Sequence, residues 1–154
     1  MTILISLFAF STISVSAATS GTCGTNLKWT VDDSGTLTIS GDGNMKSYNS
    51  ISALPWYSQR ANIKKLVIGE NVTSISKYAF HSFTALTEVN WNAKSVADFQ
   101  QSDIVFYKAG QSGDGINVIF GNSVEKIPAY MFYTSSGYSY APKVTNVTIG
   151  NNVI

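Results

Sequence analysis

Short runs of alternating apolar and polar residues recur along the chain. Four of them share one form, at 66–68, 89–91, 118–120 and 147–149, and their third positions follow one another at steps of 23, 29 and 29. Such alternation is typical of strands that bury one face. Three of the four runs are followed by Gly and then Asn or Glu, which favours a tight turn. We therefore predict parallel strands centred on Val67, Asn90, Ile119 and Thr148.

The apolar positions after each strand also repeat. VIGENVTSISKYAF at 67–80 is nearly restated by IFGNSVEKIPAYMF at 119–132, and VTIGNNVI at 147–154 begins the phrase again. The apolar residues come in small groups split by polar ones, unlike a continuous helical stripe. This pattern indicates a chain that turns several corners per repeat, with short helical or 3₁₀ turns expected at 76–82 and 128–133. The residues expected to be buried as rungs of one ladder are Val72, Ile75, Phe80, Val124, Ile127 and Phe132.

A single unit of this kind cannot bury its own apolar face, so the units must stack and the first strand needs a cap. LKWTVDDSGTLTIS at 27–40 alternates around a turn at 32–35, which predicts a capping hairpin. The fold class predicted is a repeat solenoid, mainly β with short helical or 3₁₀ turns and an N-terminal β-hairpin cap. We expect the cap at 18–62 and about four repeat units at 63–154, the last of them truncated.

The amino end has a different character. Residues 3–17, ILISLFAFSTISVSA, carry no charge, and Val15-Ser16-Ala17 fits the small-x-small pattern of a signal-peptidase site. No Lys or Arg precedes the apolar run, and a buried N-terminal strand is the alternative interpretation. We predict a signal peptide at 1–17, hence a secreted or cell-surface protein with no membrane insertion after cleavage.

Composition excludes several partners. Formal net charge is +1, and the ten Lys and Arg are scattered singly apart from Lys64-Lys65, whereas nucleic acid or an anionic membrane requires a basic cluster. Cys23 is the only cysteine, so an intrachain disulfide is impossible. It is interpreted as a buried small residue of the cap, with an intermolecular disulfide or a reactive thiol as alternatives.

Candidate chemistry is sparse. His81, the only histidine, is expected to be an exposed polar residue on the outside of a rung. Asp42 and Asp114 each stand in Gly-Asp-Gly, where they are better explained as turn residues than as calcium ligands, because a calcium site needs six or more converging oxygens. We therefore expect no catalytic residues, no cofactor and no metal.

Tyrosines gather at two inserted loops, 107–115 and 134–141, which are rich in Gly and Ser. Tyr provides a large contact area with little rotamer freedom to lose, which suits an interface. Ordinary loop packing is the alternative for each of them. The residues predicted to contact a partner are Tyr107, Tyr138 and Tyr140.

Taken together, the motifs resemble the BspA-type leucine-rich repeats of bacterial surface and secreted proteins. The repeat is carried by IGENVTSI at 68–75, YAF at 78–80 and Leu86, and the entry segment by GTNLKWTV at 24–31 and by GTLTISG at 35–41, followed by Pro55-Trp56. Trp91 in a strand, Phe83 where the family often has Cys, and the two long loops depart from the pattern.

The resemblance implies a leucine-rich-repeat-like right-handed stack and an exported, non-catalytic module for adhesion or protein binding. A protein or extracellular-matrix ligand is the expected partner, and a glycan is the other partner considered. The alternative function is an accessory domain, which could bind glycans, of a larger secreted hydrolase whose catalytic part lies beyond residue 154.

Overall fold

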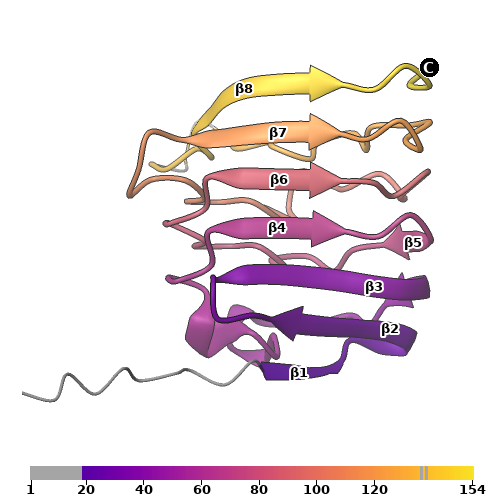
Figure 1. The fold of residues 1–154 in the computed structure, drawn as a ribbon. Coiled ribbons are helices and arrows are strands. Elements are labelled where there is room, and N and C mark those ends of the chain that lie inside the picture. Colours follow the sequence, from indigo (N-terminus) through magenta and orange to yellow (C-terminus); the bar gives the residue numbers. More distant parts are fainter. Residues whose placement is uncertain (1–18, 136, 138) are drawn as a thin grey trace, which may run out of the picture.

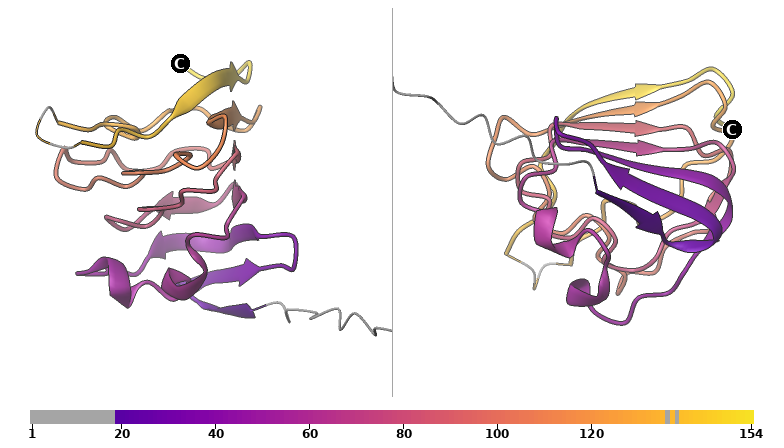
Figure 2. Two further views of the ribbon diagram at one scale, coloured as in Figure 1. Left: turned by 90° about the vertical axis from the view of Figure 1, so that its left-hand side faces the viewer. Right: turned by 60° about the horizontal axis from the view of Figure 1, so that its bottom comes forward.

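The strands of the solenoid stack on one another in chain order, like rungs (Figure 1). The computed structural model describes residues 19–135, 137 and 139–154. Seven strands follow the order β1-β2-β3-β4-β6-β7-β8, and β5 pairs with β3 off this path. The strands are β1 Thr19–Thr22, β2 Gly24–Val31, β3 Thr36–Met45, β4 Lys65–Ile68, β5 Val72–Ser74, β6 Glu88–Trp91, β7 Ile116–Phe120 and β8 Val144–Ile149. Viewed obliquely along the stack, the loops close each rung away from the sheet (Figure 2).

The predicted parallel register is confirmed. Val67 of β4 lies opposite Asn90 of β6, Asn90 lies opposite Ile119 of β7, and Ile119 lies opposite Thr148 of β8. The residues on either side of each of these centres point inward and are almost fully buried in β4, β6 and β7. A one-residue slip would turn all of them to solvent, so the hydrophobic pattern alone specifies this register.

The predicted hairpin cap is also present. β2 and β3 pair antiparallel, with Trp29 opposite Ile39, and β3 then pairs parallel with β4. The turn between them is held by Asp32, whose carboxylate accepts hydrogen bonds from the backbone N–H of Ser34 (3.0 Å) and of Thr36 (2.8 Å). β1 extends the cap by pairing antiparallel with β2, a strand that the alternation pattern did not predict.

A tryptophan links the cap to the first repeat. Trp56 is fully buried, packs edge-on against Trp29 with 6.0 Å between ring centroids, and donates its indole N–H to the carbonyl of Ala79 at 2.7 Å. Its hydrogen bond satisfies a polar group that would otherwise be costly to bury. Trp56 thus fills the core at the point where the antiparallel cap changes to the repeating stack.

Three phenylalanines form a second ladder on the loop side of the core. Phe80, Phe106 and Phe132 follow one another at equal intervals in the sequence, and their ring centroids lie 5.0 Å and 4.8 Å from one another. The backbone N–H of Phe80 donates to the carbonyl of Val105 at 3.1 Å, so neighbouring loops are hydrogen-bonded as well as packed. The loops thus repeat more regularly than the strands do.

The helical turns expected at 76–82 and 128–133 are wrong. Both segments are turns, in which Tyr78 and Tyr130 adopt the left-handed region with φ of 64° and 57°. Left-handed residues interrupt a right-handed helix, because each reverses the local twist of the backbone. The two 3₁₀ helices lie instead in the linker from the cap, η1 at Ile51–Ala53 and η2 at Tyr57–Gln59.

The predicted ladder residues of the first repeat are buried, whereas two of those near the C-terminal end of the stack are less buried than predicted. Val72, Ile75, Phe80 and Val124 are buried as predicted, but Ile127 and Phe132 are only partly buried. Within the described residues no further rung lies over them. The same cause exposes the strand residues Val147 (48%) and Ile149 (55%), whose counterparts one rung earlier are buried.

Close packing between rungs requires the glycines that follow β7 and β8, Gly121 and Gly150. A Cβ on Gly150 would lie 2.5 Å from the carbonyl oxygen of Gly121 in the rung below, and a Cβ on Gly121 would collide with the side chain of Asn92. In the second unit, where Asn92 replaces this glycine, the asparagine side chain therefore lies against Gly121 of the next unit.

No helix in residues 19–135, 137 or 139–154 is long and apolar enough to cross a membrane.

The phenylalanine ladder generates a graded stability prediction. Phe106→Ala, in the middle of the ladder, should lower the free energy of unfolding by about 3–5 kcal/mol, because it opens a cavity between two rungs. Phe132→Ala should cost less, about 1–2 kcal/mol, because its ring is already partly in contact with solvent. Urea denaturation measures both. Equal losses would contradict the assignment of Phe132 to an uncovered rung.

Candidate functional site

Polar side chains on the outward face of the sheet pair with one another across adjacent strands. Lys65 forms an ion pair with Glu88 at 2.7 Å, and the amide of Asn146 donates to that of Asn117 at 2.8 Å. The hydrogen bond from Lys65 lowers the pKa of the Glu88 carboxyl. These side chains lie across adjacent strands, and they already have partners within the sheet.

On the loop side, aromatic side chains from three successive loops meet. We define the aromatic ridge as Tyr78, His81, Tyr107 and Tyr140. Ring centroids are 6.4 Å apart between Tyr78 and His81, 4.9 Å between His81 and Tyr107, and 6.4 Å between Tyr107 and Tyr140. Tyr78 and His81 share one loop, and Tyr107 and Tyr140 belong to the next two, so the ridge runs along the stack.

Cationic side chains lie over the rings at this surface. The Lys108 Nζ is 4.2 Å from the centroid of Tyr140, and the Arg60 guanidinium carbon is 3.9 Å from that of Tyr57. Such cation–π contacts hold a cation in place without neutralising it. In the described part of the chain the ion pairs are Lys65–Glu88 and Lys126–Asp98, so neither Lys108 nor Arg60 is paired with a carboxylate.

His81 differs from its expected position. It was predicted to be exposed, but it is half-buried between tyrosine rings, with its Nδ1 2.7 Å from the hydroxyl oxygen of Ser82. Desolvation, with a smaller contribution from the positive charges of Lys108 and Arg60, lowers its pKa to about 4. The ring is therefore neutral at pH 7 and acts as an aromatic member of the ridge.

Two of the three predicted contact residues are brought together here. The backbone N–H of Lys108 donates to the carbonyl of Tyr140 at 3.2 Å, which places Tyr140 beside Tyr107. Tyr140 is 47% exposed. Tyr138, the third predicted residue, lies outside the described residues. Whether these residues contact a partner stays a prediction.

Sequence reasoning missed His81, Lys108 and Arg60 as members of this surface. One signal was present, because the residue after each ladder phenylalanine is aromatic: His81, Tyr107 and Tyr133 recur at the same even interval as the phenylalanines. The unequal steps between the strands concealed this even spacing. Arg60 has no counterpart in the repeats and is placed by the linker after η2.

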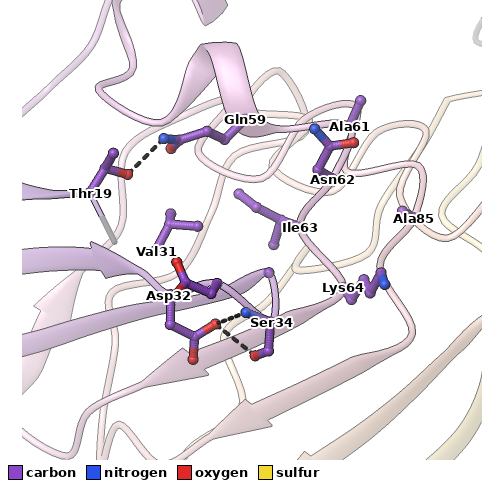
Figure 3. A pocket seen from close by; sticks show the side chains of 12 residues that line it. Thr19, Val31, Asp32, Ser34, Gln59, Ala61, Asn62, Ile63, Lys64 and Ala85 are labelled. Carbon is purple, nitrogen blue, oxygen red and sulfur yellow. Dashed lines mark hydrogen bonds between the residues drawn. The ribbon is translucent and has the colours of Figure 1, made fainter. Parts of the chain in front are cut away.

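A groove of about 400 Å³ lies at the cap end, between the β2–β3 turn and the linker that follows η2 (Figure 3). Its lining includes Gln59, Asn62 and Lys64. The amide nitrogen of Gln59 donates to the Thr19 hydroxyl at 2.6 Å, whereas its buried oxygen has no partner. Asp32 also lines the groove, but its carboxylate is occupied by the turn, and the hydrogen bonds from Ser34 and Thr36 lower its pKa.

Reactive and metal-ligating groups are dispersed over the described residues. No three His, Cys, Asp or Glu side chains there are grouped to hold a metal ion. Asp42 and Asp114 are both exposed, and each precedes a glycine with positive φ. Asp114 lies in a bend, in agreement with its interpretation as a turn residue, whereas that interpretation is wrong for Asp42, which lies within β3 beside an irregularity in its pairing with β2. Cys23 is a free thiol, 1% exposed, whose pKa is raised to about 11 by desolvation, so it is almost entirely protonated at neutral pH.

The lowered pKa of His81 generates a pH prediction. Between pH 6.5 and about 4 the unfolded chain binds a proton at this ring that the folded chain does not, so stability falls as pH falls through that window. His81→Gln should remove the contribution of this ring to the loss of stability. Between pH 7 and pH 4.5 the melting temperature of the variant should fall by about 2–4 °C less than that of the wild type, and the effect is small because the ring is partly solvated. Parallel curves would place the pKa of His81 near its ordinary value.

Comparison with known proteins agrees with this architecture. Residues 49–154 match the BspA type leucine rich repeat region, in six copies. No curated protein gives a significant match. The fold is similar to the crystal structure of a leucine-rich repeat protein from Eubacterium ventriosum, with a TM-score of 0.54 and 21% identity over 86% of this chain and 40% of that one. The chain thus spans less than half of that protein. Since the family match covers most of the sequence, this chain belongs to the BspA-type leucine-rich repeat family.

Proposed function

We propose that the chain is an exported, non-catalytic binding module that presents the aromatic ridge to a protein or extracellular-matrix partner. The observation that carries this proposal is the gathering of Tyr78, His81, Tyr107 and Tyr140 from three successive loops into one continuous row of ring contacts. Family membership supports it, because stacked repeats of this kind form extended, rigid surfaces suited to binding. The charge-free segment at 3–17 supports export.

Rigidity favours binding at this surface. The backbone N–H of Ser82 donates to the carbonyl of Tyr107 at 2.8 Å, and that of Lys108 donates to Tyr140, so the ridge residues are tied to one another across rungs. A surface ordered before binding loses less conformational entropy when a partner arrives. The exposed part of Tyr140 adds a large, stiff contact area of the kind enriched at protein interfaces.

The ionisable groups support a non-catalytic role. Nucleophilic catalysis requires a nucleophile within hydrogen-bonding reach of a base. The hydroxyl of Ser82 does lie beside His81, but the depressed pKa of the ring makes it a weak base. The Cys23 thiol is buried and protonated.

The cap-end groove favours a second candidate function, binding of a small polar ligand such as a sugar. The observation that supports this function is the unpartnered amide oxygen of Gln59, which lines the same groove as Asn62 and Lys64. This arrangement fits the predicted glycan-binding accessory domain. A glycan array probed with the wild type and with Asn62→Ala tests it, and equal signals from both proteins would remove the groove from consideration.

The aromatic ridge generates a binding prediction with an internal control. Tyr140→Ala should weaken capture of immobilised extracellular-matrix proteins by about 2 kcal/mol, roughly thirtyfold in Kd, the usual effect of truncating a central aromatic contact. Tyr130 is exposed to the same 47% but does not belong to the ridge, so Tyr130→Ala should leave capture unchanged. Biolayer interferometry measures both. Equal losses from the two variants, or no loss from Tyr140→Ala, would remove the ridge as the binding surface.

A further inference from the structure

The distribution of charge identifies the kind of partner that the aromatic ridge accepts. We infer that the ridge, flanked by Arg60 and Lys108, binds an acidic segment of a protein in which carboxylate side chains alternate with apolar ones. This inference rests on the proposed function, because it names the partner of the same surface.

The loop segments that carry the ridge contain positive charge alone. Four segments, 51–62, 76–86, 104–113 and 129–143, contain the ridge and its surroundings, and none of them contains Asp or Glu. Each contains one cation; these are Arg60, Lys77, Lys108 and Lys143. All nine carboxylates of the chain lie outside these segments. A net charge near zero therefore conceals a one-sided distribution, which attracts a partner of opposite sign.

The carboxylates nearest in sequence are not paired with the cations of this surface. Asp103 and Asp114 flank one of the segments, and among the described residues neither of them forms an ion pair; the Asp103 side chain accepts a hydrogen bond from the backbone N–H of Gln100 at 2.7 Å. Asp98 is paired with Lys126, and Glu88 is paired with Lys65 on the sheet face. The fields of Arg60 and Lys108 converge on His81, where both disfavour protonation of the ring. The positive charge of both side chains thus reaches His81, within the ridge.

The cations that lie over the tyrosine rings favour a protein partner over a sugar that would stack on those rings. Lys108 lies over Tyr140, Arg60 lies over Tyr57, and the rings of His81 and Tyr107 are tilted against each other at 42°. Partners that bind by stacking, such as bases, need an open ring face. The edges and hydroxyls of tyrosine rings suit hydrogen bonds to peptide groups and contact with apolar side chains.

The direction of the ridge fits an extended chain. Successive rungs of a parallel sheet are about 4.8 Å apart, and the ridge crosses two such steps along the stack. A partner strand of roughly nine residues would span up to about 30 Å, enough to lie over the whole ridge. Its carboxylates would meet the two cations, and its apolar side chains would meet the tyrosines between them.

The test uses two labelled peptides of about nine residues, repeats of Glu-Ser-Phe and of Gln-Ser-Phe, in fluorescence anisotropy titrations with the purified chain. The Glu peptide should bind at least about tenfold more tightly than the Gln peptide, and raised salt should weaken it. Arg60→Gln/Lys108→Gln should remove this difference. Lys28→Gln/Lys94→Gln removes the same charge from exposed sites outside the ridge and should retain it. Arg60→Lys/Lys108→Arg keeps the charge and should also retain it.

The remaining outcomes each overturn the inference or separate it from the proposed function. Equal binding of the two peptides, or equal losses in the two Gln double variants, would refute the acidic partner. Dextran sulfate that binds more tightly than the Glu peptide, and loses affinity in the Arg60→Gln/Lys108→Gln protein, would reassign the site to an anionic glycan. If Tyr140→Ala alone abolished capture of matrix proteins while that double variant retained it, the proposed function would stand and the acidic partner would be refuted. Thermal unfolding of each variant confirms that it is folded.

Discussion

The structure depends on parallel pairing of each rung with the one before it. Backbone hydrogen bonds between rungs fix the strands in register, and this same stacking is what covers the apolar side chains of each unit. A single rung has neither a core nor paired edges, so the first rung of the stack needs another element to cover it. The hairpin of β2 and β3 is that element, because β3 is paired antiparallel on one side and offers a parallel edge to β4 on the other.

The same constraint explains how a binding surface arises in this chain. The loops that close neighbouring rungs are hydrogen-bonded to one another, as in the bond from the backbone N–H of Phe80 to the carbonyl of Val105, so they keep the spacing of the strands. The phenylalanine ladder packs beneath these loops. Side chains that follow the ladder residues must then lie in a row at the surface. The alignment of the aromatic ridge along the stack is therefore a consequence of repetition, whereas its chemistry is set by differences between repeats and, at Arg60, by the linker.

A large part of the fold could be predicted from sequence patterns because the dominant interactions are local and periodic. The strand centres and the hairpin turn at Asp32 follow from alternation and turn chemistry. The turns at Tyr78 and Tyr130 were mistaken for helix, since the left-handed φ of a non-glycine residue leaves no mark in composition. Ile127 and Phe132 were expected to be buried because equivalent positions were treated alike, although burial depends on a neighbour above.

The repeat, its register and the cap could be predicted from the amino-acid sequence, because each follows from alternation and turn residues within short segments that recur along the chain. The shortage of reactive groups follows from composition. Tyr107 and Tyr140 were indicated as well, though only as loop tyrosines. The three-dimensional arrangement was needed to show that these two meet, that His81 packs between rings and loses its basicity, and that Arg60 and Lys108 stand without carboxylate partners in the described part of the chain. Contacts between rungs join residues that are far apart in the sequence, and insertions of unequal length hide that pairing from any count along the chain.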